Sequence, residues 1–165
     1  MLRSLLFLST VLVGALGVGS AQATVSIEQS DLHGPRALSE QTRAAVIRDY
    51  LQSWQSLRSA LEQNRAGLLD PSFIGTARDK LTETIRQQAA IGIKTIYQDG
   101  AHDIQIVFYS PDGLSLELKD KVEYDVEVLD HDKVKTTQHI IARYVIVLTP
   151  AEVRWRVRVF QAAGE

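Results

Sequence analysis

The stretch from Leu114 to Val128, LSLELKDKVEYDVEV, alternates between apolar and polar residues at almost every position. Its odd-numbered positions are all polar, and its even-numbered positions are all apolar except Asp120. This period of two is typical of a β-strand that has one face in solvent and the other face packed against a core. A straight strand of this length would run roughly 50 Å at about 3.3 Å per residue, so we expect it to bend or bulge, most readily at Asp120.

Three further strands are predicted around this one. Residues 102–109, 134–148 and 153–160 show strand-like patterns, and turn sequences separate them, among them SPDG at 110–113. By parity, the last of these strands places Trp155 and Val159 inward. The same parity places its three arginines, at 154, 156 and 158, outward.

Two amphipathic helices precede the strands. Ser39 can cap the first helix, in which apolar residues recur every three or four positions as far as Leu61, and Gly67 is a plausible end. The second helix is predicted from about Thr76 to Ala90. This order predicts a single α+β domain, residues 37–162, in which two N-terminal helices pack on one face of a strongly curved, cone-like antiparallel sheet of about four strands.

The N-terminus has the pattern of a secretory signal peptide at residues 1–23. Arg3 precedes an uncharged, mostly apolar run from Ser4 to Gly19, and small residues lead up to Ala23. We expect cleavage after Ala23, no membrane span in the mature chain, and a secreted or periplasmic location. The alternative is a retained anchor helix, for which the apolar run is short. Residues 24–36 show no sustained period and are predicted to form a flexible arm.

Composition argues against several classes of function. The chain has 18 basic and 20 acidic residues, a balance that offers no basic surface for nucleic acid. It has no cysteine, so it has no disulfide and no site for a lipid anchor at the cleavage point. Its four histidines are scattered and no phosphate-binding loop is present, so the sequence predicts neither a metal nor a cofactor.

Asp120 is the one residue that breaks the alternation. If the alternation continues through it, the carboxylate points to the core and faces His102 or Ile104 on one side and Ala142 on the other. With His102 it could then form an acid/base pair. The other interpretation, which we favour because long strands bulge, leaves Asp120 in a bulge or in solvent beside a neighbouring lysine.

Two other groups of residues are candidates for binding. Aromatic residues expected on the inner side could line a site for a small apolar ligand, although Trp54 lies on an apolar helix stripe and is expected to be core; they are Trp54, Tyr124, Tyr144 and Trp155. The outward residues of the last two strands could form an interaction face: Ile141, Arg143, Val145, Arg154, Arg156 and Arg158. Apolar residues among arginines suit an envelope protein or a homodimer partner, whereas the arginines alone would be a solvated face.

The order of elements resembles the nuclear-transport-factor-2-like (cystatin-like) superfamily over residues 39–161. The features that carry this resemblance are a long Trp-containing helix, a second helix, and a meander of strands bearing Arg143-Tyr144 and Trp155-Arg156-Val157. The chain is most similar to the intermembrane-space-type domain of a chloroplast division protein and to bacterial extracytoplasmic domains. The superfamily includes ligand-binding proteins, a few isomerases and dehydratases, and many non-catalytic interaction domains. Its enzymes typically use an Asp–His pair inside the cone, which only Asp120 and His102 could match here.

We therefore predict a secreted or periplasmic domain without enzymatic activity, which binds a protein or holds a small ligand between helices and sheet. The absence of a catalytic motif and the mixed apolar and arginine face favour this interpretation. The alternative is a small-molecule isomerase- or hydrolase-like enzyme, in which Asp120 is the base and His102 and Tyr124 assist it.

Overall fold

The computed structural model describes residues 23–28 and 36–163, so the predicted signal peptide lies outside the described residues apart from Ala23. The elements follow in the order β1 (Thr24–Ile27), α1 (Glu40–Glu62), η1 (Ala66–Leu69, a 3₁₀ helix), α2 (Gly75–Ala90), β2 (Ile93–Tyr109), β3 (Leu116–Asp130), β4 (Lys133–Pro150) and β5 (Trp155–Ala162). This is an α+β domain, as the sequence predicts.

Helix α1 begins where its cap predicts. The Ser39 hydroxyl accepts a hydrogen bond from the Thr42 backbone N–H at 3.2 Å, which satisfies one of the free donors in the first turn. The helix ends at Glu62, one turn earlier than Gly67 suggested, because residues 66–69 form the separate η1. Its buried stripe includes Val46, Tyr50 and Trp54.

The sheet has five described strands in the order β1-β2-β3-β4-β5, so the prediction of about four strands is an undercount. The additional strand is β1, which pairs parallel to residues 101–104 of β2, and all other pairs are antiparallel. The prediction that residues 24–36 form a flexible arm is therefore wrong for Thr24–Ile27. Four residues are too few to show a period in the sequence, and backbone pairing with β2 orders them.

Strand β2 is longer than the predicted strand of residues 102–109, because it begins at Ile93 and continues through residues 99–100. The register with β3 shifts between Asp99 and Ala101, which is a β-bulge rather than a turn. A side chain at Gly100 would lie 3.1 Å from the Glu123 carbonyl oxygen. Glycine therefore lets the two backbones approach closely while the strand goes on.

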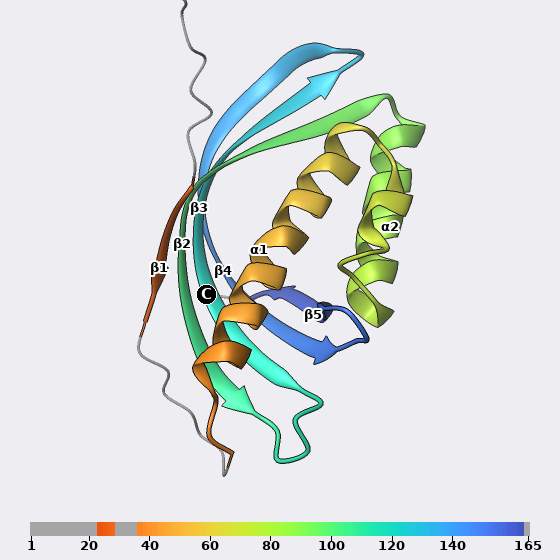
Figure 1. The fold of residues 1–165 in the computed structure, drawn as a ribbon. Coiled ribbons are helices and arrows are strands. Elements are labelled where there is room, and N and C mark those ends of the chain that lie inside the picture. The colour runs from red at the N-terminus through yellow and green to blue at the C-terminus, as the bar shows by residue number, and fades with distance from the viewer. Residues whose placement is uncertain (1–22, 29–35, 164–165) are drawn as a thin grey trace, which may run out of the picture.

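The sheet is strongly curved, and both helices lie on its concave side (Figure 1). The core fills the space between them. Even-numbered residues of β3, such as Leu118 and Val122, are buried against the apolar stripe of α1. Each large apolar side chain buried in this way contributes roughly 1.5–3 kcal/mol to folding. The alternation in the central strand thus determines which face of the sheet the helices cover.

Candidate functional site

Asp120 points into the core, so the favoured interpretation that it sits in a bulge or in solvent is wrong. Strand β3 keeps its alternation through this position, and the bulges of β2 and β3 occur elsewhere. The register pairs Asp120 with Ile104 on β2 and with Tyr144 on β4, not with Ala142, which pairs with Val122. The residue is only 1% exposed. A buried carboxylate of this kind needs partners, and α1 and β2 supply them.

The partners of Asp120 form a hydrogen-bonded chain across the core. The Tyr50 hydroxyl donates to Asp120 Oδ2 at 2.6 Å, and His102 Nδ1 lies 2.7 Å from the same oxygen. The Trp54 Nε1–H donates to the Tyr50 hydroxyl at 2.8 Å, because Tyr50 and Trp54 are four residues apart on one face of α1. Asp120 Oδ1 has no hydrogen-bond partner among the described residues. The structure therefore brings the predicted Asp–His pair together, with one oxygen left over.

The surroundings of Tyr50 in this hydrogen-bonded network favour the neutral, protonated form of its hydroxyl group. Burial, followed by the nearby Asp120 carboxylate, raises the pKa of Tyr50 well above its ordinary value. Tyr50 is thus a hydrogen-bond donor at any physiological pH. When Asp120 is ionised, His102 must carry a proton on Nδ1 to donate to it. Both side chains are enclosed in the core, since Asp120 is 1% exposed and His102 is 2% exposed.

Three of the four predicted aromatic ligand residues lie in one cluster on the concave side. The ring centroid of Trp54 lies 6.1 Å from that of Tyr124 and 5.6 Å from that of Tyr144, and the two tyrosine hydroxyls are 3.1 Å apart. Phe160 stacks on Tyr144 at 4.8 Å. Trp155 is separate from this cluster and packs against Tyr109. Trp54 is core, as its place on the apolar stripe of α1 predicts, at 3% exposed.

Sequence parity missed Phe160 for a definite reason. The β4–β5 register shifts between Val147 and Leu148, so that Val159 pairs with Val147 on the outer face and Phe160 pairs with Ile146 on the inner face. The prediction that Val159 points inward is therefore wrong. The extra residue of this bulge is Arg158 in β5 itself, and a run of alternating residues does not show where its own strand bulges.

The predicted interaction face does not form a single surface. Ile141, Arg143 and Val145 lie together on the outer face of β4, where Ile141 is 60% exposed. The arginines of the last strand go elsewhere. Arg156 donates to the backbone carbonyls of Asp70 and Phe73, which run along the outer edge of β5. Arg158 stands beside residue 75, and Arg154 lines a hollow near Asp49, outside β5.

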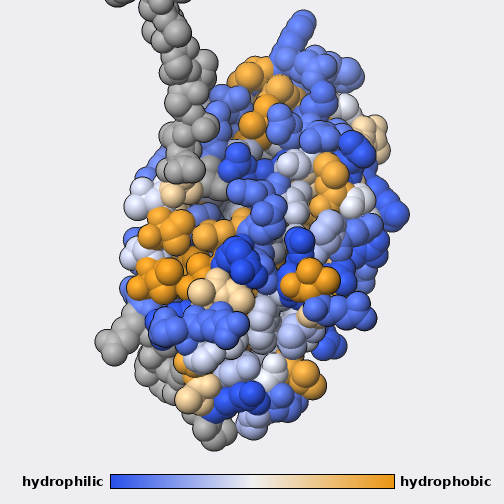
Figure 2. All heavy atoms as spheres, in the orientation of Figure 1, coloured by the Kyte–Doolittle hydropathy of each residue, from blue (hydrophilic) through white to orange (hydrophobic). Residues whose placement is uncertain are grey.

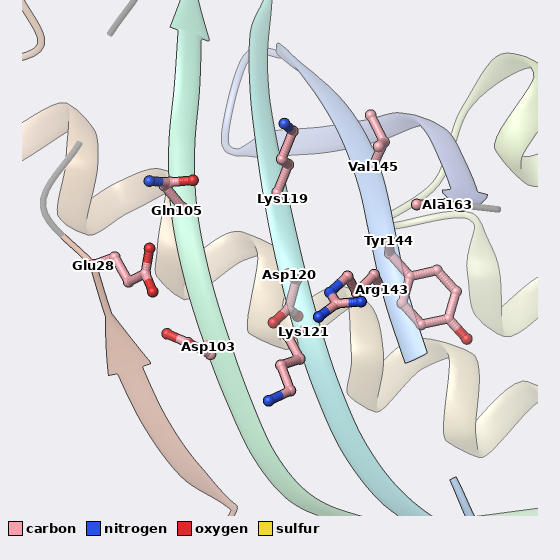
Figure 3. A pocket seen from close by; sticks show the side chains of 10 residues that line it. All are labelled: Glu28, Asp103, Gln105, Lys119, Asp120, Lys121, Arg143, Tyr144, Val145 and Ala163. Atoms are coloured by element: carbon pink, nitrogen blue, oxygen red, sulfur yellow. The ribbon is translucent and has the colours of Figure 1, made fainter. Parts of the chain in front are cut away.

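A groove of about 380 Å³ lies on the outer face of the sheet beside Arg143 (Figure 3). The register sets its composition, since Asp103, Lys121 and Arg143 are cross-strand neighbours on β2, β3 and β4. The side chains along it are Glu28, Asp103, Gln105, Lys119, Lys121, Arg143 and Val145. Figure 3 shows the carboxylates of Glu28 and Asp103 at one side and the basic side chains at the other. Sequence reasoning had treated the lysines only as solvated neighbours of Asp120.

The basic residues of this groove are available for a partner. None of Lys119, Lys121 and Arg143 forms an ion pair with another described residue. Asp120 also contributes to the lining, but its carboxylate faces the concave side and is buried. The groove and the Asp–His pair are therefore separate features on opposite faces of β3.

Two features can be stated for the part of the chain that the structure describes. That part contains no group of three or more histidine, aspartate or glutamate side chains placed to hold a metal ion. None of its helices is long and apolar enough to cross a membrane.

Comparison with known proteins finds matches in fold and none in sequence. No protein-family model and no curated protein matches the sequence. Solved structures do match, and they bear out the predicted resemblance at the level of the fold.

The intermembrane space region of the chloroplast protein ARC6 has a TM-score of 0.65 and 11% identity, over 79% of this chain and 100% of that one. A protein from Novosphingobium aromaticivorans assigned as a scytalone dehydratase has a TM-score of 0.52 and 12% identity, over 76% and 89% of the two chains. Aln2 from a Streptomyces species has a TM-score of 0.51 and 11% identity, over 78% and 94%. At these identities the likeness shows the fold alone.

Proposed function

We propose that this chain is a secreted or periplasmic domain without enzymatic activity, which binds another envelope protein through the outer face of β4. We call Ile141, Arg143 and Val145 the β4 face. The observation that carries the proposal is the contrast between this face and the interior. The β4 face combines an exposed isoleucine with an arginine that has no ion-pair partner among the described residues. Apolar side chains beside Arg are typical of protein interfaces.

The interior supports the same conclusion. A ligand site needs a concave space with polar groups converging on it. Here Asp120, His102 and Trp54 are each buried and bonded or packed against one another. The side of the molecule drawn in Figure 2 is mostly hydrophilic, with hydrophobic side chains in several separate groups over both the sheet and the helices. The surface therefore offers more for recognition than the core does.

The location belongs to the same proposal. The signal-peptide pattern of residues 1–23 supports export and cleavage after Ala23. The intact mass of the chain purified from its own envelope tests this directly. A mature chain that starts at Thr24 is the expected result. A chain that retains residues 1–23 would contradict cleavage and would mean that this segment stays in place as an anchor.

Site-specific photo-crosslinking tests the binding surface. Benzoylphenylalanine replaces Ile141 in one variant and Gln55, an exposed residue of α1, in a matched control. In the intact envelope we expect a discrete adduct from position 141 and none from position 55. Equal adducts from both positions, or no adduct from position 141, would contradict the proposal.

One observation favours a second candidate, a small-molecule isomerase- or hydrolase-like enzyme. Asp120 Oδ1 is buried without a partner among the described residues, and His102 stands ready to shuttle a proton at Oδ2. Such an enzyme must open the core around Trp54 to admit its substrate. Solvent exchange of the Trp54 Nε1–H, assigned by comparison with Trp155→Phe, measures that opening. Exchange within seconds at neutral pH would support the enzyme, and strong protection would remove it.

A further inference from the structure

Strand β4 has a long free edge. Residues 133–148 pair with β3 on one side, apart from a bulge at Lys135, but β5 pairs only with the second part of β4, from Tyr144 to Pro150. Among the described residues, no strand pairs with the other edge of residues 133–142. A row of unpaired backbone groups of this kind is a template for another strand.

One hydrogen bond identifies the backbone groups that face the free edge. The Ala163 N–H donates to the Arg143 carbonyl at 2.8 Å, so Arg143 directs its backbone groups away from β3. In an antiparallel ladder, alternate residues do the same. Thr137, His139 and Ile141 therefore present their N–H and C=O groups to the free edge. The intervening residues bond to β3.

The two parts of this edge differ in character. Near the turn, Lys133 and a bulge at Lys135 protect it, which is how proteins commonly block edge pairing. Residues 136–142, TTQHIIA, carry no lysine, arginine or carboxylate and include two threonines and two isoleucines. Such residues favour strand pairing. The unprotected part lies directly beside Arg143 and the β4 face.

We infer that an extended, acidic segment of a partner protein adds to the sheet as a strand along residues 137–141 of β4. This inference rests on the proposed function and specifies how the partner binds. The partner's backbone would pair with the three outward residues, and an apolar side chain would lie beside Ile141. Arg143 selects an acidic residue at the end of the segment that lies beside it, whereas Glu123, Asp125 and Glu127 of β3, next to residues 141, 139 and 137, favour an uncharged middle. Strand β4 contains no aspartate or glutamate from Lys133 to Pro150, and Arg143 lacks an ion-pair partner among the described residues.

The same charges argue against a second copy of this chain as the occupant. Two β4 edges related by a two-fold axis would pair antiparallel. Because the charged residues of β4 are all basic, registers centred on residues 138 to 140 would place Arg143 opposite or diagonal to Lys133 or Lys135 of the other copy. Like charges opposite one another destabilise a strand pair. A homodimer through this edge is thus disfavoured.

Hydrogen exchange with a defined peptide tests the inference on the full chain. The probe is a blocked peptide of sequence Glu-Thr-Val-Thr-Val-Thr-Glu, and its control has lysine in place of both glutamates. We expect the acidic peptide to slow exchange of the Thr137, His139 and Ile141 amides by about tenfold or more at saturation. The lysine peptide should leave them unchanged.

Three variants sharpen the test. Thr137→Pro removes an N–H that faces the free edge, so it should abolish protection by the acidic peptide. Arg143→Glu should weaken binding of the acidic peptide and strengthen binding of the lysine peptide. This variant leaves the backbone groups of the edge unchanged. Lys80→Glu, on the exposed side of α2, should alter neither.

Protection by both peptides alike, or no protection by the acidic peptide at millimolar concentration, would overturn the inference. So would concentration-dependent protection without peptide, because that result would mean a second copy occupies the edge. These failures are distinct from failure of the proposed function. A crosslink at position 141 without edge protection would leave the β4 face as the binding surface and remove only strand addition.

Discussion

Asp120 is buried in the core although only one of its two carboxylate oxygens has hydrogen-bond partners among the described residues. Its Oδ2 takes part in two short contacts, while Oδ1 has none among the described residues. Breaking a buried pair of this kind leaves the remaining groups unpaired, which is the larger part of the cost. The Asp–His pair therefore serves as a polar anchor that ties α1 and β2 to β3.

Replacing this anchor should be costly. We expect Asp120→Ala to lower the free energy of unfolding by about 3–5 kcal/mol, because Tyr50 and His102 lose their acceptor. Urea unfolding followed by circular dichroism measures the loss. The control is Asp125→Ala, which removes an exposed carboxylate of the same strand and should change stability little. Equal effects for both variants would show that Asp120 is not an anchor.

Two glycines offer a second comparison at the residue scale. Gly92 has a φ of +72°, and a side chain there would approach the His131 ring to 2.8 Å. We expect Gly92→Ala to destabilise the protein by about 1–2 kcal/mol, from the left-handed backbone alone. Gly67→Ala should be close to neutral, because nothing lies within 4 Å of its side-chain position. Thermal unfolding of both variants checks the difference, and a neutral Gly92→Ala would contradict it.

At the scale of elements, α1 supplies Tyr50 and Trp54 to the hydrogen-bonded chain around Asp120, so its first turn matters. Removing the Ser39 cap in Ser39→Ala should cost about 1 kcal/mol of unfolding free energy. Gln55→Ala, in the exposed middle of the same helix, should lie within about 0.5 kcal/mol of the parent. Urea unfolding compares the two variants. If Ser39→Ala matched Gln55→Ala, the cap would contribute nothing measurable.

The elements also show where prediction from sequence succeeds and where it stops. Periods of two and of three to four residues located both helices and the principal strands, because these periods reflect which face is buried. Strand β1 was missed because four residues show no period. The bulge in β5 opposite Val147 and Leu148 turned Val159 outward and Phe160 inward, so the predicted inward position of Val159 was wrong.

The candidate site was only partly predictable for a similar reason. The alternation of β3 allowed an inward orientation of the Asp120 side chain. That orientation is stabilised by Tyr50, 70 residues away in the chain, which donates a hydrogen bond to the carboxylate in the core. The outer groove depends on cross-strand register, which brings Asp103, Lys121 and Arg143 side by side. Register is a property of the assembled sheet rather than of any one strand.

At the scale of the whole molecule, tyrosines link its layers and make its stability sensitive to alkali. Burial, followed by the nearby Tyr124, raises the pKa of Tyr97 to about 12, and burial also raises the pKa of Tyr50. Tyrosine hydroxyls in the unfolded chain ionise at about pH 10, as they do in model peptides. The unfolded chain therefore loses protons that the folded chain retains, and the free energy of unfolding should fall as the pH rises from about 10 to about 12.

Urea unfolding at a series of alkaline pH values measures this dependence. Stability should be flat below about pH 9 as far as these tyrosines are concerned, and Tyr97→Phe should show a shallower fall above about pH 10. A stability that stays constant up to about pH 11.5 would contradict the burial of these hydroxyl groups.

The molecule as a whole combines a packed interior with a binding exterior. Native mass spectrometry of the full chain, released gently from its own envelope, tests that division most directly. We predict a complex with another polypeptide, lost in Arg143→Glu, and no small molecule bound to the chain. A lone chain carrying a reproducible small extra mass that disappears in Asp120→Asn would contradict this division, because the interior would then hold the ligand.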